Sequence, residues 1–80
     1  MSHTPHELHE EFPAHVALMS TLKAADAEFA QMMEAYHKVN RAVHRAETDV
    51  EPTDDANLEQ MRRQRMRLKD QIWSVLSTAA

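Results

Sequence analysis

The chain has 80 residues, of which 13 are acidic and 9 basic, for a formal net charge of −4 at pH 7, and it contains neither glycine nor cysteine. The lack of cysteine excludes disulfides and thiolate metal ligands, and the lack of glycine excludes phosphate-binding loops of the GxGxxG or P-loop kind. A chain of this length forms one domain at most, with a small core.

The composition favours helices throughout. Ala, Met, Glu, Arg, Gln and Leu are abundant, whereas strand-forming residues are sparse. No apolar run approaches the roughly 18 residues of a membrane span, and the beginning, rich in His and Glu, is unlike a signal peptide. We therefore expect an all-α, cytoplasmic protein that needs no cofactor and has no contact with a membrane.

Residues 1–12 are expected to form a flexible leader, ahead of a single domain at 13–80. Thr4 can cap a helix, and Glu7 stands at the capping-box position. Pro13 interrupts any helix begun there, because it lacks an amide hydrogen and disfavours a helical residue before it. A short, frayed turn is the most that this pattern predicts.

Three histidines in this leader raise the question of a metal site. His3, His6 and His9 follow one another in steps of three. On a helix such steps rotate the side chains around the axis, so they do not converge on one ion as i, i+4 pairs do. We assign no metal ligands, although the sequence alone leaves zinc binding by these histidines open.

The centre of the chain carries a ladder of apolar residues at alternating spacings of four and three. Its members are Leu18, Leu22, Ala25, Phe29, Met32, Tyr36, Val39, Val43, Ala46 and Val50. This spacing is typical of a helix that packs lengthwise against another helix. Asp26 lies beside the ladder and can cap a new helix, so two alternatives stand: one helix from 13 to 48, or helices at about 13–24 and 26–48. We prefer the break.

A second long helix is expected at about 54–77. Pro52 cannot continue the preceding helix, and Thr53 or Asp54 can cap the next one. Its apolar ladder contains one charged residue: Leu58, Met61, Arg65, Leu68, Ile72, Val75 and Ala79. Because the connector is short, the two long helices should be antiparallel neighbours, with Asn40 roughly opposite Arg65.

A second apolar stripe on the last helix is left without a partner by this pairing; it consists of Met66, Trp73 and Leu76. A homodimer that forms a four-helix bundle covers it most simply, and the alternatives are the N-terminal segment folding back in a monomer and a different partner protein. The candidate interface residues are Phe12, Val16, Met19, Met66, Trp73 and Leu76.

Several segments together resemble the YdcH-like family of small bacterial proteins, from about Phe12-Pro13 almost to the C-terminus. They are Asp26-Ala27-Glu28-Phe29, Tyr36-His37-Lys38-Val39-Asn40, Val43-His44-Arg45-Ala46-Glu47, Glu51-Pro52-Thr53 and Leu58 through Ile72. The resemblance implies an antiparallel helical hairpin with coiled-coil character. It implies no activity, so no functional residues are carried over.

Two positions depart from the family pattern. Asn40 stands where an acidic residue is usual, and Gln71 where a Glu is usual. Since an acid at position 40 would neutralise Arg65, the sequence predicts that Asn40→Asp stabilises the protein.

We therefore expect a non-enzymatic helical interaction or assembly module that self-associates and binds a protein partner. Serines and carboxylates show no catalytic spacing, and a helical hairpin offers no cleft that would shift their pKa values. The alternative function is nucleic-acid association through basic positions, since five of them fall within eight residues of the last helix. The candidate residues for that alternative are Arg41, Arg45, Arg62, Arg63, Arg67 and Lys69.

Overall fold

The computed structural model describes residues 4–48 and 53–79, which are helical with short connections and contain no strand. The elements are α1 (Leu8–Glu11), the 3-10 turn η1 (Pro13–His15), α2 (Val16–Ala25), α3 (Ala27–Glu47) and α4 (Asp55–Ala79). The all-helical prediction is confirmed, and the long helices lie within two residues of their expected bounds. In the described ranges, none of the helices is long and apolar enough to span a membrane.

The predicted break between the second and third helices falls at Asp26. This residue has extended backbone angles, and its side-chain oxygen accepts hydrogen bonds from the amides of Glu28, at 3.0 Å, and Phe29, at 3.3 Å. The side chain thus satisfies two amides that have no partner within the helix. Capping by Asp26 explains why the apolar ladder continues in the sequence although the helix does not.

Asp26→Ala is expected to lower the free energy of unfolding by about 1 kcal/mol, the usual cost of losing a helix cap. Asp26→Asn is the matched control, because an amide oxygen can accept the same bonds and should keep nearly all of the stability. Urea denaturation of the three proteins measures both changes. Equal stability of the alanine and asparagine variants would contradict a capping role.

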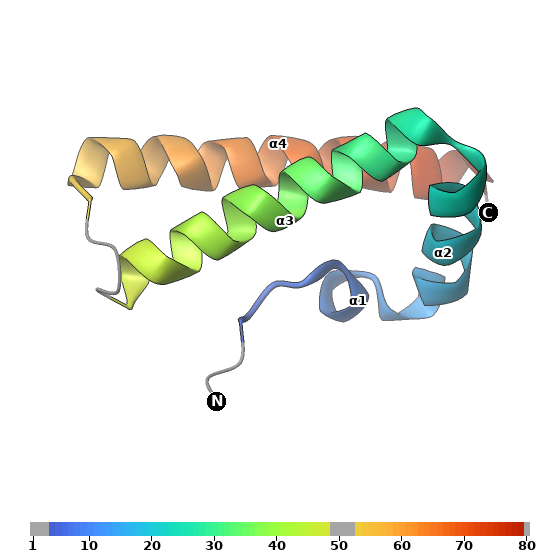
Figure 1. Cartoon of the computed structure of the whole chain (residues 1–80), viewed down its shortest axis with the longest axis horizontal. Coiled ribbons are helices and arrows are strands. Elements are labelled where there is room, and N and C mark those ends of the chain that lie inside the picture. Colours follow the sequence, from blue (N-terminus) through green and yellow to red (C-terminus); the bar gives the residue numbers. More distant parts are fainter. Residues whose placement is uncertain (1–3, 49–52, 80) are drawn as a thin grey trace.

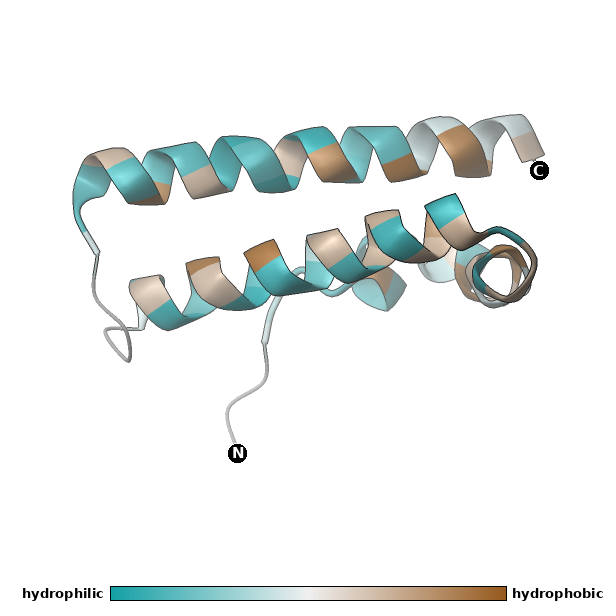
Figure 2. Cartoon of the chain, turned by 45° about the horizontal axis from the view of Figure 1, so that its top comes forward, coloured by the Kyte–Doolittle hydropathy of each residue, from teal (hydrophilic) through white to brown (hydrophobic). Residues whose placement is uncertain are grey.

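The two long helices run in opposite directions and contact each other, with α2 lying across the end where α3 begins and α4 ends (Figure 1). The hydrophobic residues of α4 gather toward its C-terminal half, while its first half is mostly hydrophilic (Figure 2). The core is accordingly densest at the end of the molecule where α2 is also available to cover it.

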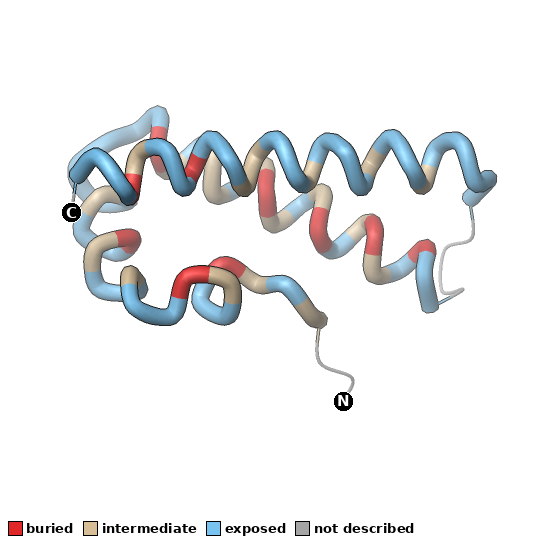
Figure 3. Tube along the Cα trace, turned by 180° about the vertical axis from the view of Figure 1, so that it is seen from behind, coloured by how far each residue is buried: buried red, intermediate tan, exposed pale blue. Residues whose placement is uncertain are grey.

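The core combines residues from every helix. Its buried cluster consists of Leu8, Phe12, Met19, Phe29, Tyr36, Ile72 and Leu76. Buried positions recur along α3 at the spacing of the predicted ladder, and Val43 and Ala46 continue the buried side of α3 beyond that cluster (Figure 3). Further along the same ladder, Ala25 is exposed, and Val50 lies outside the described residues.

Residues 4–12, here called the strap, differ from the expected flexible leader. Leu8 is 2 % exposed and Phe12 is 9 % exposed, and both belong to the core cluster. Pro13 does end the local helix, as predicted, but ending a helix does not prevent the segment before it from packing. Leu8 lines a groove with residues of α2 and α3, and Phe12 stacks on Trp73 of α4, so the strap covers apolar surface of all three helices.

Three of the six predicted interface residues are likewise part of the chain's own core. Phe12, Met19 and Leu76 are buried within the single chain, so they are not available to a second copy or a partner. Phe12 of the N-terminal segment stacks on Trp73 of α4, with ring centroids 5.6 Å apart. The segment therefore covers part of Trp73, which stays 45 % exposed.

Candidate interaction surface

Two buried polar side chains of α3 hold the backbone of the strap. The Tyr36 hydroxyl donates a hydrogen bond to the carbonyl oxygen of His6, and the Asn40 side-chain amide donates to that of Pro5 at 2.9 Å. Burial, reinforced by the nearby charge of Glu11, raises the pKa of Tyr36 to about 12, so its hydroxyl keeps the proton that it donates at neutral pH. His6 has a φ of +62°, an unusual conformation for a residue other than glycine.

Two acidic residues of the strap pair with basic groups beneath it. Glu7 accepts from His37 at 2.9 Å and lies 3.8 Å from Arg41, both on α3. Glu11 lies 3.3 Å from Lys69 of α4 and 3.0 Å from His6. Burial raises the pKa of Glu11, but hydrogen bonds to His6 and Lys69 outweigh burial, so that this pKa lies below its ordinary value.

Trp73 forms the wall of an open groove beside the strap. Its ring is stacked on Phe12 with centroids 5.6 Å apart, and His15 approaches edge-on at 5.5 Å. The groove has a volume of about 420 Å³ and is also lined by Lys69 and Asp70. Trp73 is 45 % exposed in spite of these contacts. An exposed, well-oriented tryptophan is the residue type that most often anchors protein interfaces.

Met66 lies in a second, adjoining groove of about 320 Å³. Glu11 and Lys69 line both grooves, so Met66 and Trp73 lie on the same side of the molecule. Val16, which is 47 % exposed, lies instead in a third groove with Leu8 and Met19. The structure thus brings two of the predicted interface residues together, Met66 and Trp73, and separates Val16 from them.

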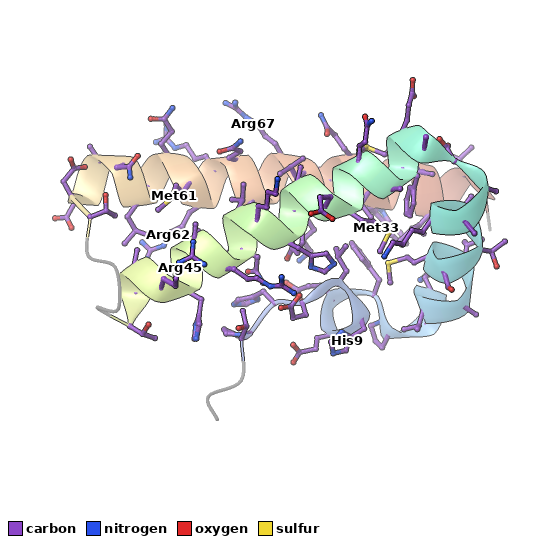
Figure 4. All side chains as sticks on the ribbon, in the orientation of Figure 1. His9, Met33, Arg45, Met61, Arg62 and Arg67 are labelled. Carbon is purple, nitrogen blue, oxygen red and sulfur yellow. The ribbon has the colours of Figure 1, made fainter. Side chains whose placement is uncertain are left out.

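The basic positions of α3 and α4 are largely engaged with acidic side chains. Arg62 pairs with Glu47 at 2.7 Å, and Arg63 pairs with Glu59 at 3.3 Å. Arg62 lies toward α3, near Arg45, whereas Arg67 points away from α3 (Figure 4). Arg63 and Arg67 line one groove on α4, whereas Arg41 and Lys69 are paired with the strap. The basic side chains within 4–48 and 53–79 are thus divided between separate parts of the surface.

The predicted pairing of Asn40 with Arg65 is present. The Arg65 guanidinium donates to the side-chain oxygen of Asn40 at 3.2 Å, and Asn40 is 1 % exposed. Asn40 therefore joins three segments: α3 on which it stands, α4 through Arg65, and the strap through Pro5. The sequence gives little indication that Asn40 and Tyr36 contact the strap. The one feature that points to it is that these two polar residues lie one turn apart on an otherwise apolar face of the helix.

The structure describes two of the three histidines considered as metal ligands, His6 and His9. His3 lies outside the described residues, and His6 points to Glu11 while His9 is exposed. Across 4–48 and 53–79, no group of three or more His, Cys, Asp or Glu residues is arranged to hold a metal ion.

Comparison with known families adds one result to this geometry. A family model described as "Protein of unknown function (DUF465)" matches residues 29–76, which is more than half of the chain. No curated protein and no solved structure matches the chain significantly. The matched range begins near the start of α3 and ends at Leu76 of α4, so the strap and α2 lie outside it. The chain belongs to this family, which is the YdcH-like family of small helical proteins.

Proposed function

We propose that this protein is a non-enzymatic interaction module that self-associates through the side of α4 carrying Met66 and Trp73. Each copy would contribute α3 and α4, joined as an antiparallel hairpin with coiled-coil character, to a four-helix bundle. The observation that carries the proposal is the exposure of these two large apolar side chains on one stripe of α4, at 59 % and 45 %.

The order of residues along this stripe is self-complementary. Met66, Lys69, Asp70 and Trp73 follow at helical positions i, i+3, i+4 and i+7, which share one face. A twofold axis passing between Lys69 and Asp70 of two antiparallel α4 helices would place Met66 against Trp73 of the second copy. The same axis would place Lys69 opposite Asp70. Such a patch can pair with itself without burying like charges, as a twofold interface requires.

Light scattering across a concentration series tests self-association directly. The wild-type mass should rise toward twice the chain mass of 9.2 kDa with concentration. Trp73→Ala should weaken the dimer by roughly 30-fold or more, as expected for an interface anchor. Asp70→Lys should weaken it roughly tenfold, because it places two lysines together on each side of the twofold axis.

Two controls in this experiment distinguish a loss of self-association from a loss of folding. The Asp70 side chain makes no hydrogen bond or ion pair within residues 4–48 and 53–79, so its reversal leaves the strap contacts intact. Glu34→Lys makes the same change of charge at an exposed position of α3 and should leave the dimer unaffected. A wild-type protein that stays monomeric throughout the series would overturn the proposal, as would an equally strong dimer of both α4 variants.

A further inference from the structure

We propose that the face of α3 and α4 beneath the strap is a peptide-binding site for an acidic segment of a partner protein. In the structure, the strap of the same chain occupies this site. The segment recognised would carry two acidic residues four positions apart, each followed directly by an apolar anchor, as Glu7-Leu8 and Glu11-Phe12 do in the strap. This goes beyond the self-association proposed above, and the peptide site adjoins the self-association surface at Lys69.

The site recognises peptide backbone as well as side chains. Tyr36 and Asn40, one turn apart on α3, donate hydrogen bonds to the carbonyl oxygens of two successive residues, Pro5 and His6. Bonds to main-chain oxygens do not depend on the side chains of the bound segment, so another segment can accept them equally well. The positive φ of His6 is a conformation that the segment would not prefer by itself, which indicates that the site imposes the shape.

The charges of the site are complementary to an acidic ligand. On the receptor side, His37 and Arg41 project from α3 and Lys69 from α4, whereas Glu7 and Glu11 are the groups of the strap that meet them. Glu7 stands at the N-cap of α1 and Glu11 is its last residue, so the two acids meet basic groups of α3 and α4 respectively. A segment with lysine or arginine at these positions would place like charges together, so the charge pattern selects against basic partners.

Two apolar anchors complete the recognition. Leu8 and Phe12, again four residues apart, are 2 % and 9 % exposed and belong to the core cluster. Leu8 begins the single turn of α1 and Phe12 follows its last residue, so one helical turn presents both apolar anchors. The ligand class is therefore a short acidic amphipathic segment.

A second copy of the chain is a poor candidate for the external ligand. The strap of another copy has the same sequence and hence the same contacts, whereas the strap in place acts at an effective concentration in the millimolar range. The strap of the same chain therefore binds the site in preference to an identical strap from a second copy. An external ligand displaces it only by binding more tightly, which requires a different sequence and thus a different protein.

A labelled synthetic peptide with the sequence of residues 4–13 tests the site on the full-length protein by fluorescence anisotropy. Wild type should bind it weakly, because the site is already occupied. Glu7→Gln combined with Glu11→Gln weakens the attached strap without altering the site, and should tighten binding roughly tenfold as the open fraction rises. Adding Asn40→Ala to that variant should remove the gain. A peptide with Leu8→Asp should not bind.

Control variants show whether a change in peptide binding comes from weakening the strap or only from the change of net charge. Glu28→Gln with Glu34→Gln makes the same change of charge at exposed α3 positions away from the strap, and should bind the peptide as wild type does. Trp73, the only tryptophan, stacks on Phe12 and reports release of the strap by its fluorescence. Leu8→Ala in the full chain is a second way to weaken the strap.

Failure of both strap variants to bind the peptide more tightly than wild type would overturn the proposal. The same conclusion would follow if the strap variants bound the peptide no more tightly than the Glu28→Gln, Glu34→Gln control. Anisotropy does not depend on the mass of the protein. Failure of the peptide site and failure of self-association through α4 are therefore distinguished.

Discussion

Replacing Leu8 by alanine is expected to lower the free energy of unfolding by about 2–3 kcal/mol, in the range found for large-to-small changes at buried sites. Leu8 is among the most completely buried side chains, although it lies in a four-residue helix near the N-terminus. The substitution removes apolar contacts with the core cluster and leaves a cavity that the strap fills only in part. For a chain of this length the melting temperature should fall by roughly 10 °C or more.

Val16→Ala is the matched control for this experiment. Val16 is also an aliphatic residue of the N-terminal segment, but it is exposed, so its truncation should change the stability by no more than about 0.5 kcal/mol. Urea denaturation at one fixed protein concentration compares the three proteins, because self-association would add to the apparent stability. A Leu8→Ala protein as stable as the control would place the strap outside the cooperative fold.

Asn40→Asp is expected to destabilise the protein by about 1–2 kcal/mol, the cost of leaving a buried polar group without its partner. Pairing with Arg65 alone led to the opposite expectation from the sequence. The structure reverses the expected change in stability, because the Asn40 amide also donates a hydrogen bond to the carbonyl oxygen of Pro5. A carboxylate has no hydrogen to donate there, and it would face the carbonyl oxygen with like partial charge. The stronger bond to Arg65 offsets only part of this loss.

A double-mutant cycle with Arg65→Met separates the two contacts of Asn40. The Asp substitution should cost more in the Arg65→Met background, because the favourable charge pair is then missing while the clash with the strap carbonyl remains. Thermal unfolding of the four proteins supplies the comparison. A rise in the melting temperature of the single Asn40→Asp variant would show that the contact with Arg65 dominates and that the strap bond contributes little.

The strap also explains why only part of the Trp73 ring on α4 is exposed. Phe12 is buried against one side of Trp73, and the remaining exposed part of that ring continues the stripe that begins at Met66. Release of the strap would therefore remove the stacking partner of the residue that we place at the centre of self-association. Peptide binding and dimerisation would be coupled through Trp73, and the proposed experiments measure each of them separately.

Local and periodic features of the molecule followed from the sequence alone. The ladder on α3 predicted which of its faces is buried, since a spacing of three and four residues places Phe29, Tyr36 and Val43 on one side of a helix. Asp26 indicated the helix break because a capping side chain acts on amides only two or three residues away. The register of Asn40 against Arg65 followed from the short connector, which leaves two antiparallel helices little freedom to slide.

The placement of the strap and the composition of the Trp73 groove were decided by tertiary structure. The bonds that hold the strap join residues 30, 35 and 58 positions apart in the chain, from Tyr36, Asn40 and Lys69 to their partners in the strap. Helical periodicity describes the neighbours of a residue on its own helix and says nothing about which distant segment covers it. Pro13 marked where a helix must end, but burial of the residues before it depends on apolar surface supplied by α2, α3 and α4 together. That surface exists only once these helices have packed.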